Sequence, residues 1–403
     1  MIRSTRIHQW IAGVVMVAAL PLAALAQGRD PVKIGLVWSK SGSFSSMGVD
    51  VANAIRFAVD EANALGGVDG RKVLLAEADD ESNPESGRRA AEKLARDGHN
   101  LLIGPISSSV SLAILQNLDR WDAALIGTIS KSDKLTGEAC SARFIRTNHS
   151  DGMDLAMISR WAKELKGNNF AVLAADYVWG HDSAKAFAEA ARANGKNVSL
   201  KLFVPMGTKD YAPYIQQLKE ANVDAIWVAD VSGGIAFVKQ AADFNLIPQT
   251  PLVGHALLSN FLINATGRSL ENVPGNVGFT PDIDTPRTKA FVAAWKNRFN
   301  RLPSDTEGQA YNGAIILFEG IKLARSVEPA AVTRALRGAQ VETLYGKMTI
   351  RAADNQLLIP NYVARAKVVD GVLRPVIERT YPASIAPPAS PVCRVRMLRE
   401  AAT

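Results

Sequence analysis

The stretch VKIGLVWSKSGSFSSMGVDVANAIRFAVDEANAL, residues 32–65, decides the fold. Its first seven residues, VKIGLVW (32–38), are mostly apolar and partly β-branched, which predicts a buried strand. A polar Gly/Ser loop follows, and VANAIRFAVDEANAL (51–65) then carries apolar residues at helical spacing. GGVDG (66–70) ends that helix, because glycine tolerates the left-handed conformation found at helix C-termini. Strand, loop and helix in this order are the repeating unit of a parallel α/β sheet.

The same unit recurs along the 403 residues, a length sufficient for two domains with separate cores. A second series of units begins near residue 150. Strand–helix–strand alternation predicts parallel sheets flanked by helices, so the expected fold class is α/β with two Rossmann-like lobes. The strands predicted after the first are KVLLAEAD (72–79), NLLIG (100–104), AALIG (123–127), FAVLAAD (170–176), VSLKLFV (198–204), DAIWVAD (224–230) and PLVG (251–254).

The N-terminus has the pattern of an export signal. Arg3 and Arg6 precede an apolar run, residues 11–26, that ends in the small-x-small pattern Ala-Leu-Ala. A transmembrane anchor is the alternative, but the run is shorter than the ~20 apolar residues needed to span a bilayer and Pro21 interrupts it. We therefore predict a cleaved signal peptide over residues 1–26 and a periplasmic location.

Composition and motifs argue against two classes of protein. The formal net charge is +7, but both signs are interleaved, as in residues 79–97, and no basic stripe with aromatic residues points to nucleic acid. The sequence has no G-x-S-x-G, no H-E-x-x-H, no P-loop and no strand-linked G-x-G-x-x-G. We therefore expect a protein that is not an enzyme and has no cofactor, no metal and no nucleic-acid partner.

Cys140 and Cys393 are the two cysteines of the chain. Two cysteines in an oxidising compartment predict a disulfide, which here would tie the C-terminal tail back to the body of the protein. Metal binding is the weaker interpretation, because neither cysteine has C-x-x-C or C-x-x-H spacing.

A family resemblance rests on an ordered set of stretches that extends over nearly all of the mature chain. Together they resemble the type I periplasmic solute-binding proteins of ABC importers, the leucine/isoleucine/valine-binding protein family. No single stretch is specific, whereas their order is. The stretches are EANALGGVDGRKV (61–73), DDESNP (79–84), IGPISSS (103–109), IGTISKSDKLT (126–136), ADYVWG (175–180) and QAADFNL (240–246).

The resemblance implies lobes that are discontinuous in sequence, because three segments of such proteins cross between them. Lobe one would comprise residues 32–148 and 280–343, and lobe two residues 149–279 and 344–381. Residues 382–403 would form a Pro-rich tail. A small solute would bind in the cleft as the hinge closes, and a monomer would deliver it to an ABC permease and ATPase complex at the inner membrane.

Ligands of such sheets bind beyond the carboxyl ends of the strands, where two loops are rich in serine. Ser107, Ser108 and Ser109 precede a predicted helix, so they either cap it or hold an anionic group of a ligand. By resemblance, the position of Ser108 contacts a ligand carboxylate. In the next strand-end loop Ser130 offers a polar contact, and Lys131 is either a surface lysine or the partner of a carboxylate.

Several aromatic residues also lie near predicted strand ends. By resemblance, the ring of Tyr177 covers the ligand, and Trp179 is a second candidate in the same loop. Trp38 ends the first strand and belongs either to the core or to the cleft. Ser45 and Met47 occupy the first loop, where amino-acid binders of the family often carry an aromatic residue, which suggests a different ligand shape.

Two polar residues of lobe two complete the candidate site. Asp230 follows a strand and either accepts hydrogen bonds from a ligand or caps the helix that begins at Gly234. Leucine-type binders carry, after the following strand, a glutamate that holds the ligand ammonium, but here Ala256 has that place and His255 lies beside it. His255 is either a ligand contact or a hydrogen-bonded structural histidine.

These observations predict the extracytoplasmic substrate-binding component of an ABC transporter. The predicted solute is small and bears a carboxylate, and it is either an amino acid or an aromatic or other organic acid. The alternative is a ligand-sensing protein of the same fold, such as an amide or amino-acid sensor.

Overall fold

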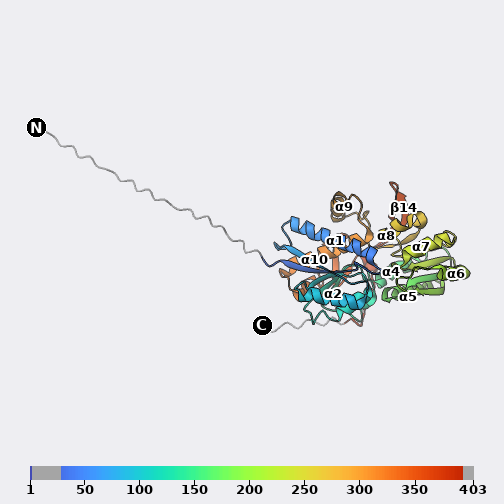
Figure 1. Cartoon of the computed structure of the whole chain (residues 1–403), viewed down its shortest axis with the longest axis horizontal. Helices are drawn as coiled ribbons and strands as arrows, with labels where there is room; N and C mark the ends of the chain where they lie inside the picture. Colours follow the sequence, from blue (N-terminus) through green and yellow to red (C-terminus); the bar gives the residue numbers. More distant parts are fainter. Residues whose placement is uncertain (2–28, 394–403) are drawn as a thin grey trace.

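The protein folds into two α/β lobes in a computed structural model, which describes residue 1 and residues 29–393 (Figure 1). Each lobe is built on one central, mainly parallel sheet flanked by helices. The predicted fold class is therefore confirmed. The first predicted strand coincides with β1 (Val32–Trp38), and the helix after it is α1 (Ser45–Ala64).

Lobe one has an eight-stranded sheet in the order β11-β12-β13-β5-β4-β3-β1-β2. After β1, its strands are β2 (Val73–Asp79), β3 (Leu101–Gly104), β4 (Ala124–Gly127), β5 (Phe144–Arg146), β11 (Gln340–Thr343), β12 (Gly346–Arg351) and β13 (Gln356–Leu358). After α1, its helices are α2 (Pro84–Arg96), α3 (Ser108–Leu115), α9 (Pro286–Phe299), α10 (Asp305–Ala324) and α11 (Pro329–Leu336).

Neighbouring side chains of β1 enter different cores because a strand turns successive side chains to opposite faces of its sheet. Leu36 lies in the core that also contains buried residues of α1 and α10. Val37 lies in a second core, with Leu102 of β3 and buried residues of α2 and α3. Helices thus cover both faces of the sheet.

Lobe two has a seven-stranded sheet in the order β15-β14-β10-β9-β8-β6-β7. Its strands are β6 (Asn169–Ala175), β7 (Asn197–Val204), β8 (Ala225–Ala229), β9 (Leu252–His255), β10 (Pro274–Val277), β14 (Asn361–Val369) and β15 (Val372–Tyr381). Its helices are α4 (Asp151–Trp161), α5 (Val178–Ala193), α6 (Ala212–Glu220), α7 (Gly234–Asp243) and α8 (Asn260–Thr266). Phe187 of α5 stacks on Trp227 of β8, with ring centroids 4.4 Å apart.

The boundary expected after residue 343 is wrong. Strands β12 and β13 extend the sheet of lobe one, so the last crossing to lobe two falls between β13 and β14. Gln356 pairs with Arg146 of β5, and Ile350 and Leu357 are fully buried. The short strands of this edge take their stability from these distant partners, which the local pattern does not show.

Hydrogen bonds join the crossing segments to one another and to lobe one. His149, between β5 and α4, bonds through Nε2 to the carbonyl oxygen of Pro360, at 2.8 Å. Burial lowers the pKa of His149 to about 4, so the ring is neutral and Nε2 is the donor. Asp305, at the start of α10, accepts the backbone N–H of Phe279 at 2.6 Å. The hinge is therefore held by polar contacts as well as by covalent connection.

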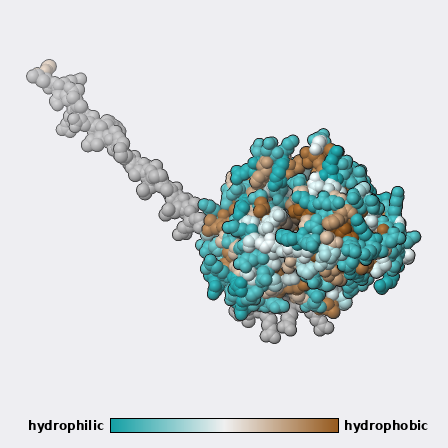
Figure 2. Space-filling model, turned by 45° about the vertical axis from the view of Figure 1, so that its right-hand side comes forward, coloured by the Kyte–Doolittle hydropathy of each residue, from teal (hydrophilic) through white to brown (hydrophobic). Residues whose placement is uncertain are grey.

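The predicted disulfide is confirmed. Cys140 and Cys393 are bonded, with their Cα atoms 5.6 Å apart, and the bridge attaches the tail to lobe one. Apart from residue 1, the predicted signal peptide lies outside the described residues, as do residues 394–403 of the tail. In the part of the chain that the structure describes, no helix is long and apolar enough to cross a membrane. The face shown in Figure 2 is mainly hydrophilic, with small apolar patches between polar side chains.

Replacing the tail cysteine, Cys393→Ser, should lower the free energy of unfolding by about 2–5 kcal/mol, because the bridge closes a long loop and restricts the unfolded chain. Urea denaturation of the oxidised protein measures the change. A reductant should bring the wild type to the level of the variant and leave the variant unchanged. Identical denaturation curves for oxidised wild type and variant would contradict this role of the bridge.

Replacing the hinge carboxyl, Asp305→Asn, should remove a pH-dependent loss of stability. Burial raises the pKa of Asp305 from 3.8 to about 6, so the folded protein keeps a proton that the unfolded chain releases. The unfolding free energy of the wild type therefore falls as pH rises from about 4 to about 6, by roughly 3 kcal/mol for this group. Denaturation at several pH values should give a smaller fall in the asparagine variant, and parallel curves would refute the assignment.

Candidate functional site

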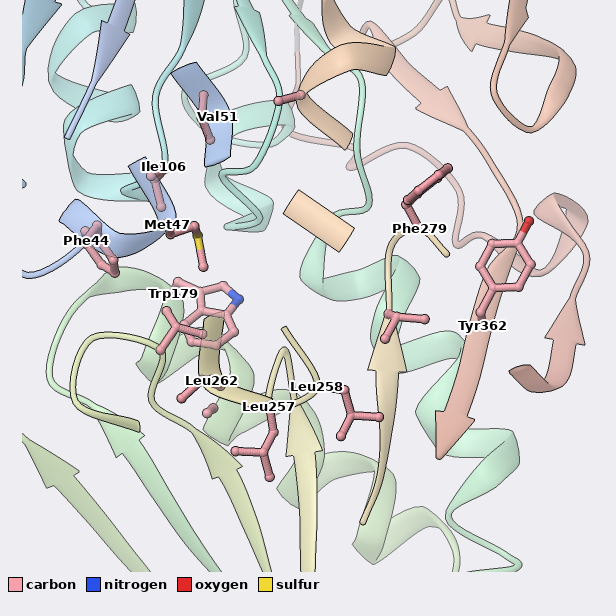
Figure 3. Packing of buried hydrophobic residues seen from close by; sticks show 14 of the residues in the cluster. Phe44, Met47, Val51, Ile106, Trp179, Leu257, Leu258, Leu262, Phe279 and Tyr362 are labelled. Atoms are coloured by element: carbon pink, nitrogen blue, oxygen red, sulfur yellow. The ribbon is translucent and has the colours of Figure 1, made fainter. Parts of the chain in front are cut away.

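A small cavity lies between the lobes, where the strand ends of the two sheets face each other. Its volume is about 40 Å³, and side chains of both lobes line it. Figure 3 shows Met47 and Ile106 of lobe one opposite Trp179 of lobe two. The walls already touch beside it, since the rings of Phe44 and Tyr177, one from each lobe, are 5.6 Å apart. The lining residues are Met47, Ile106, Ser108, Ile129, Lys131, Tyr177, Trp179, Val231 and Ala256.

The serine loop after β3 reaches this cavity through one of its three residues. Gly104 has a φ of +106°, and a Cβ there would lie 2.1 Å from the carbonyl oxygen of Val37, so only glycine lets the loop turn so close to β1. Ser107 is the N-terminal cap residue of α3, and Ser108 is the first helical residue and lines the cavity. Ser109 is partly exposed and does not line it. The N-terminal N–H groups of α3 thus point toward the cavity wall at Ser108.

Ser130 does not line the cavity and has a structural role. Its hydroxyl group bonds to the hydroxyl of Ser111 at 2.6 Å and to the carbonyl oxygen of Pro105 at 2.9 Å. These bonds fix the loop after β4 against the loop after β3. The next residue, Lys131, does line the cavity.

Lys131 connects the two lobes. Its Nζ atom lies 2.6 Å from Oδ2 of Asp154 on α4, and the two side chains are only 9% and 1% exposed. Asp154 keeps the pKa of Lys131 above its usual value although burial opposes this. Lys131 is therefore a buried, charged residue of the cleft and not a surface lysine. Nearby, the hydroxyl of Ser132 donates to Asp182 of α5, which gives a second polar contact between the lobes.

The aromatic wall comes from the loop after β6. Tyr177 and Trp179 both line the cavity, with their ring centroids 5.9 Å apart. Trp38 does not reach it: its ring is buried in the core of lobe one, with the guanidinium of Arg56 5.3 Å from its centroid. Ser45 is not on the wall either.

In that first loop, Ser45 begins α1, whereas its neighbours Phe44 and Met47 face lobe two. An aromatic residue therefore does lie in the first loop, at Phe44. Phe44 was not among the residues predicted from the sequence for this loop, which were Ser45 and Met47.

Asp230 is placed away from the cavity and serves the lobe itself. Its Oδ2 accepts the hydroxyl of Tyr211 at 2.5 Å, and its Oδ1 accepts the backbone N–H of Gly233 at 2.8 Å. Both oxygens are thus engaged in the turn that precedes α7, whose N-terminal cap residue is Gly233, so Asp230 is not the helix cap that the sequence suggested. The structure gives Asp230 no contact with the cavity.

His255 lies behind the aromatic wall, with its ring centroid 5.0 Å from that of Trp179. Its Nδ1 is 2.6 Å from Oγ of Ser183, and its Nε2 is 2.7 Å from Oδ2 of Asp154. Because the indole N–H of Trp227 donates to Ser183, the serine hydroxyl donates to Nδ1, and Nε2–H donates to Asp154. Burial lowers the pKa of His255, which keeps the ring neutral.

Ser183, His255 and Asp154 thus form a hydrogen-bonded series of the kind found in hydrolases. All three side chains are buried, and the structure places them behind the cavity wall and not on it. The Ser183 oxygen also accepts the Trp227 indole N–H. This arrangement fixes Asp154 in place, and Asp154 in turn holds Lys131.

Asp151 and Asp154, both on the first turn of α4, lie beside Lys131 and His255 and were not predicted from the sequence. Burial and neighbouring carboxylates raise the pKa of Asp151 well above its ordinary value. Burial opposes ionisation of Asp154 too, but Lys131 and His255 hold its pKa well below the usual range. Both acids follow the cap residue Ser150, so they have the pattern of ordinary helix-start residues.

The family model described as "Periplasmic binding protein" matches residues 31–371. The Leu/Ile/Val-binding protein BraC3 of Rhizobium johnstonii is 28% identical over 343 residues, which cover 83% of this chain and 90% of that protein.

Two solved structures share the fold. A solute-binding protein of an ABC transporter from Rhodopseudomonas palustris BisB5, in complex with 3,4-dihydroxybenzoic acid, has a TM-score of 0.81 at 24% identity and covers 88% of this chain and 98% of that one. The leucine-, isoleucine-, valine-, threonine- and alanine-binding protein of Brucella ovis, in its closed conformation, has a TM-score of 0.79 at 21% identity and covers 91% and 99%. The chain therefore belongs to the periplasmic binding proteins, in the type I class of the leucine/isoleucine/valine-binding proteins.

Proposed function

We propose that this protein is the extracytoplasmic substrate-binding component of an ABC importer and that it binds a small carboxylate-bearing solute between its lobes. The observation that carries the proposal is the composition of the cavity wall. Among the residues that the structure describes, Lys131 is the only charged side chain on a wall that is otherwise mainly apolar. A buried cation in such a place favours an anionic partner.

The wall offers a carboxylate partners of two kinds. Lys131 has three N–H donors and donates one hydrogen bond to Asp154, so two donors remain for a solute. Ser108 adds a hydroxyl and stands at the N-terminus of α3, where the helix dipole and free N–H groups stabilise a negative charge. Met47, Tyr177 and Trp179 give the rest of the solute apolar surface. The arrangement suits a compact acid with an apolar body.

The relatives support this class of solute. One is named for binding leucine, isoleucine and valine, and another was crystallised with 3,4-dihydroxybenzoic acid. Amino acids and aromatic acids share the carboxylate and differ in the rest of the molecule. Uptake of the bound solute by a strain lacking this protein tests the transport role: uptake should be lost, whereas a purely sensory protein would leave it intact.

Removing the cation, Lys131→Met, should weaken binding of carboxylates by about 10- to 100-fold, the value of a hydrogen bond to a charged group. Ser108→Ala should weaken it by about tenfold. Calorimetric titration with leucine, benzoate and 3,4-dihydroxybenzoate, alongside leucinamide and benzamide, measures the effect. Lys134→Met is the matched control, because that lysine lies in the same loop and is 47% exposed.

Wild-type protein should bind at least one acid and not its amide. The control variant should bind that acid with unchanged affinity. If amides bind as tightly as acids, or if Lys131→Met leaves acid binding unchanged, the proposed carboxylate site is wrong.

A further inference from the structure

The segment after β15 adds a fourth connection between the lobes. β15 ends in lobe two at Tyr381, which pairs with Asn361 of β14. The chain then runs through residues 382–393, here called the strap, to Cys393, which is bonded to Cys140 of lobe one. The hinge already has three crossings, between β5 and α4, between β10 and α9, and between β13 and β14. The strap and its disulfide therefore close a further covalent path from lobe two to lobe one.

The strap is attached to lobe two where it begins. Its first residues form the short helix η3 (Ala383–Ile385), which packs against α4. Ile385 and Ala386 are partly buried against the apolar core. Farther along, residues 387–393 are exposed or half-buried, and no residue of the strap is fully buried. The attachments at its ends therefore hold the strap in place, and burial along its length does not.

The strap contacts lobe one from Pro387 onward. The carbonyl oxygen of Pro387 accepts a hydrogen bond from Nη1 of Arg351, at 2.5 Å. Arg351 ends β12, and its Nε and Nη2 atoms donate to the buried carboxylate of Asp354, at 2.9 and 2.7 Å. The guanidinium group is thereby fixed within lobe one. The strap thus crosses from lobe two to lobe one between Ala386 and Pro387.

The disulfide joins the strap to the loop that holds the ion pair of the cleft. Cys140 lies between β4 and β5, in the loop that also carries Lys131. The buried guanidinium of Arg146 donates to the carbonyl oxygens of Lys131 and Ser132, at 2.8 and 2.7 Å, and so holds this loop on β5. At the other end of the strap, η3 packs on α4, which carries Asp154. The strap therefore links the two elements that meet across the cleft in the Lys131–Asp154 ion pair.

The composition of the strap gives it a nearly fixed length. It contains Pro382, Pro387, Pro388 and Pro391, and it contains no glycine. Proline fixes the backbone angle φ, and Pro-rich chains act as semi-rigid, extended spacers, whereas Gly/Ser-rich chains behave as flexible coils. A stiff strap transmits a separation of its two ends to both attachments, because it has little slack to absorb the movement.

We propose that the strap limits how far the two lobes swing open, and that reduction of the Cys140–Cys393 bridge releases this limit. Lobes of this architecture close on a solute by hinge motion, so a tether across the hinge acts on the open state. The proposal concerns the hinge and does not depend on which solute binds. The bridge would thereby make the range of hinge motion sensitive to the redox state of the surroundings.

A dithiol is the class of reductant that this release requires. One thiolate of the dithiol attacks a sulfur of the bridge and displaces the other cysteine, and the second thiol then displaces the first cysteine. Two electrons and two protons pass to the bridge, which leaves two cysteine thiols and the oxidised dithiol. Cys140 and Cys393 are both only half-buried, so a dithiol can reach them.

The distance between the cleft rims of the empty protein tests the proposal. The rims meet opposite the hinge, where a Cβ on Gly207 would lie 3.6 Å from Oγ of Ser43. Spin labels on noncanonical residues at positions 49 and 209 leave both cysteines intact, and Val49 and Lys209 are exposed. Double electron–electron resonance then gives the distribution of distances between the lobes. Circular dichroism confirms that each labelled protein is folded.

Breaking the bridge should shift this distribution toward longer distances. Dithiothreitol should produce the shift in the wild type, and Cys140→Ser and Cys393→Ser should each produce it without reductant. Dithiothreitol should change neither variant further. A bridge that only stabilises the folded state would leave the distances of the folded protein unchanged.

Lengthening the strap separates its length from the stability that the bridge supplies. An insertion of about eight Gly/Ser residues after Pro388 keeps the bridge, and it scarcely changes the closure entropy of a loop whose ends are 253 residues apart. This variant should unfold like the oxidised wild type, yet show the long distances of the reduced protein. The same insertion after Cys393, outside the closed loop, is the matched control and should keep the wild-type distribution.

Two results would overturn the proposal. The first is one distance distribution for oxidised, reduced and lengthened protein, which would show that the strap does not limit opening. The second is a shift on reduction that the lengthened strap fails to reproduce, because the cause would then be lost stability and not strap length. Neither measurement requires a solute, so failure of the proposed carboxylate site and failure of the strap are told apart.

Discussion

The buried ion pair between Lys131 and Asp154 is the interaction on which the cleft depends. It joins the loop after β4 in lobe one to α4 in lobe two. His255 holds Asp154 from behind, and Ser183 holds His255. Removing one partner of a buried ion pair is strongly destabilising because it leaves the other charge buried and unpaired. Here the lobe-two partner, Asp154, is also held by His255. The ammonium group of Lys131 is therefore already fixed in position before a charged group of a solute binds.

Much of the architecture could be predicted from the sequence because it depends on local periodicity. The expected strand over residues 32–38 coincides with β1, and the serine loop before α3 does reach the cavity at Ser108. The lobe boundary was misplaced because β12 and β13 are short and gain their stability from pairing with each other and with β5, far away in sequence. Pairing over such distances leaves no local pattern.

The candidate site was harder to predict, since a polar residue at a strand end serves either a loop or a ligand. Ser130 and Asp230 both lie at strand ends, and both side chains form hydrogen bonds within their own lobe. Asp151 and Asp154 have the pattern of ordinary helix-start residues, and only the folded lobes bring them to Lys131 and His255. Which partner a side chain finds is decided by tertiary contacts over tens to hundreds of residues.

An ion pair across the cleft also makes closure of the lobes depend on the solute. When the two charges of an ion pair leave water, the cost of desolvating them offsets most of their mutual attraction. Closure of the empty protein therefore gains little from Lys131 and Asp154. A solute that supplies further charges to the same buried cluster makes contacts that exist in the closed form alone, and only such a difference in affinity shifts the equilibrium. The same polar groups that recognise the solute thus make closure depend on it.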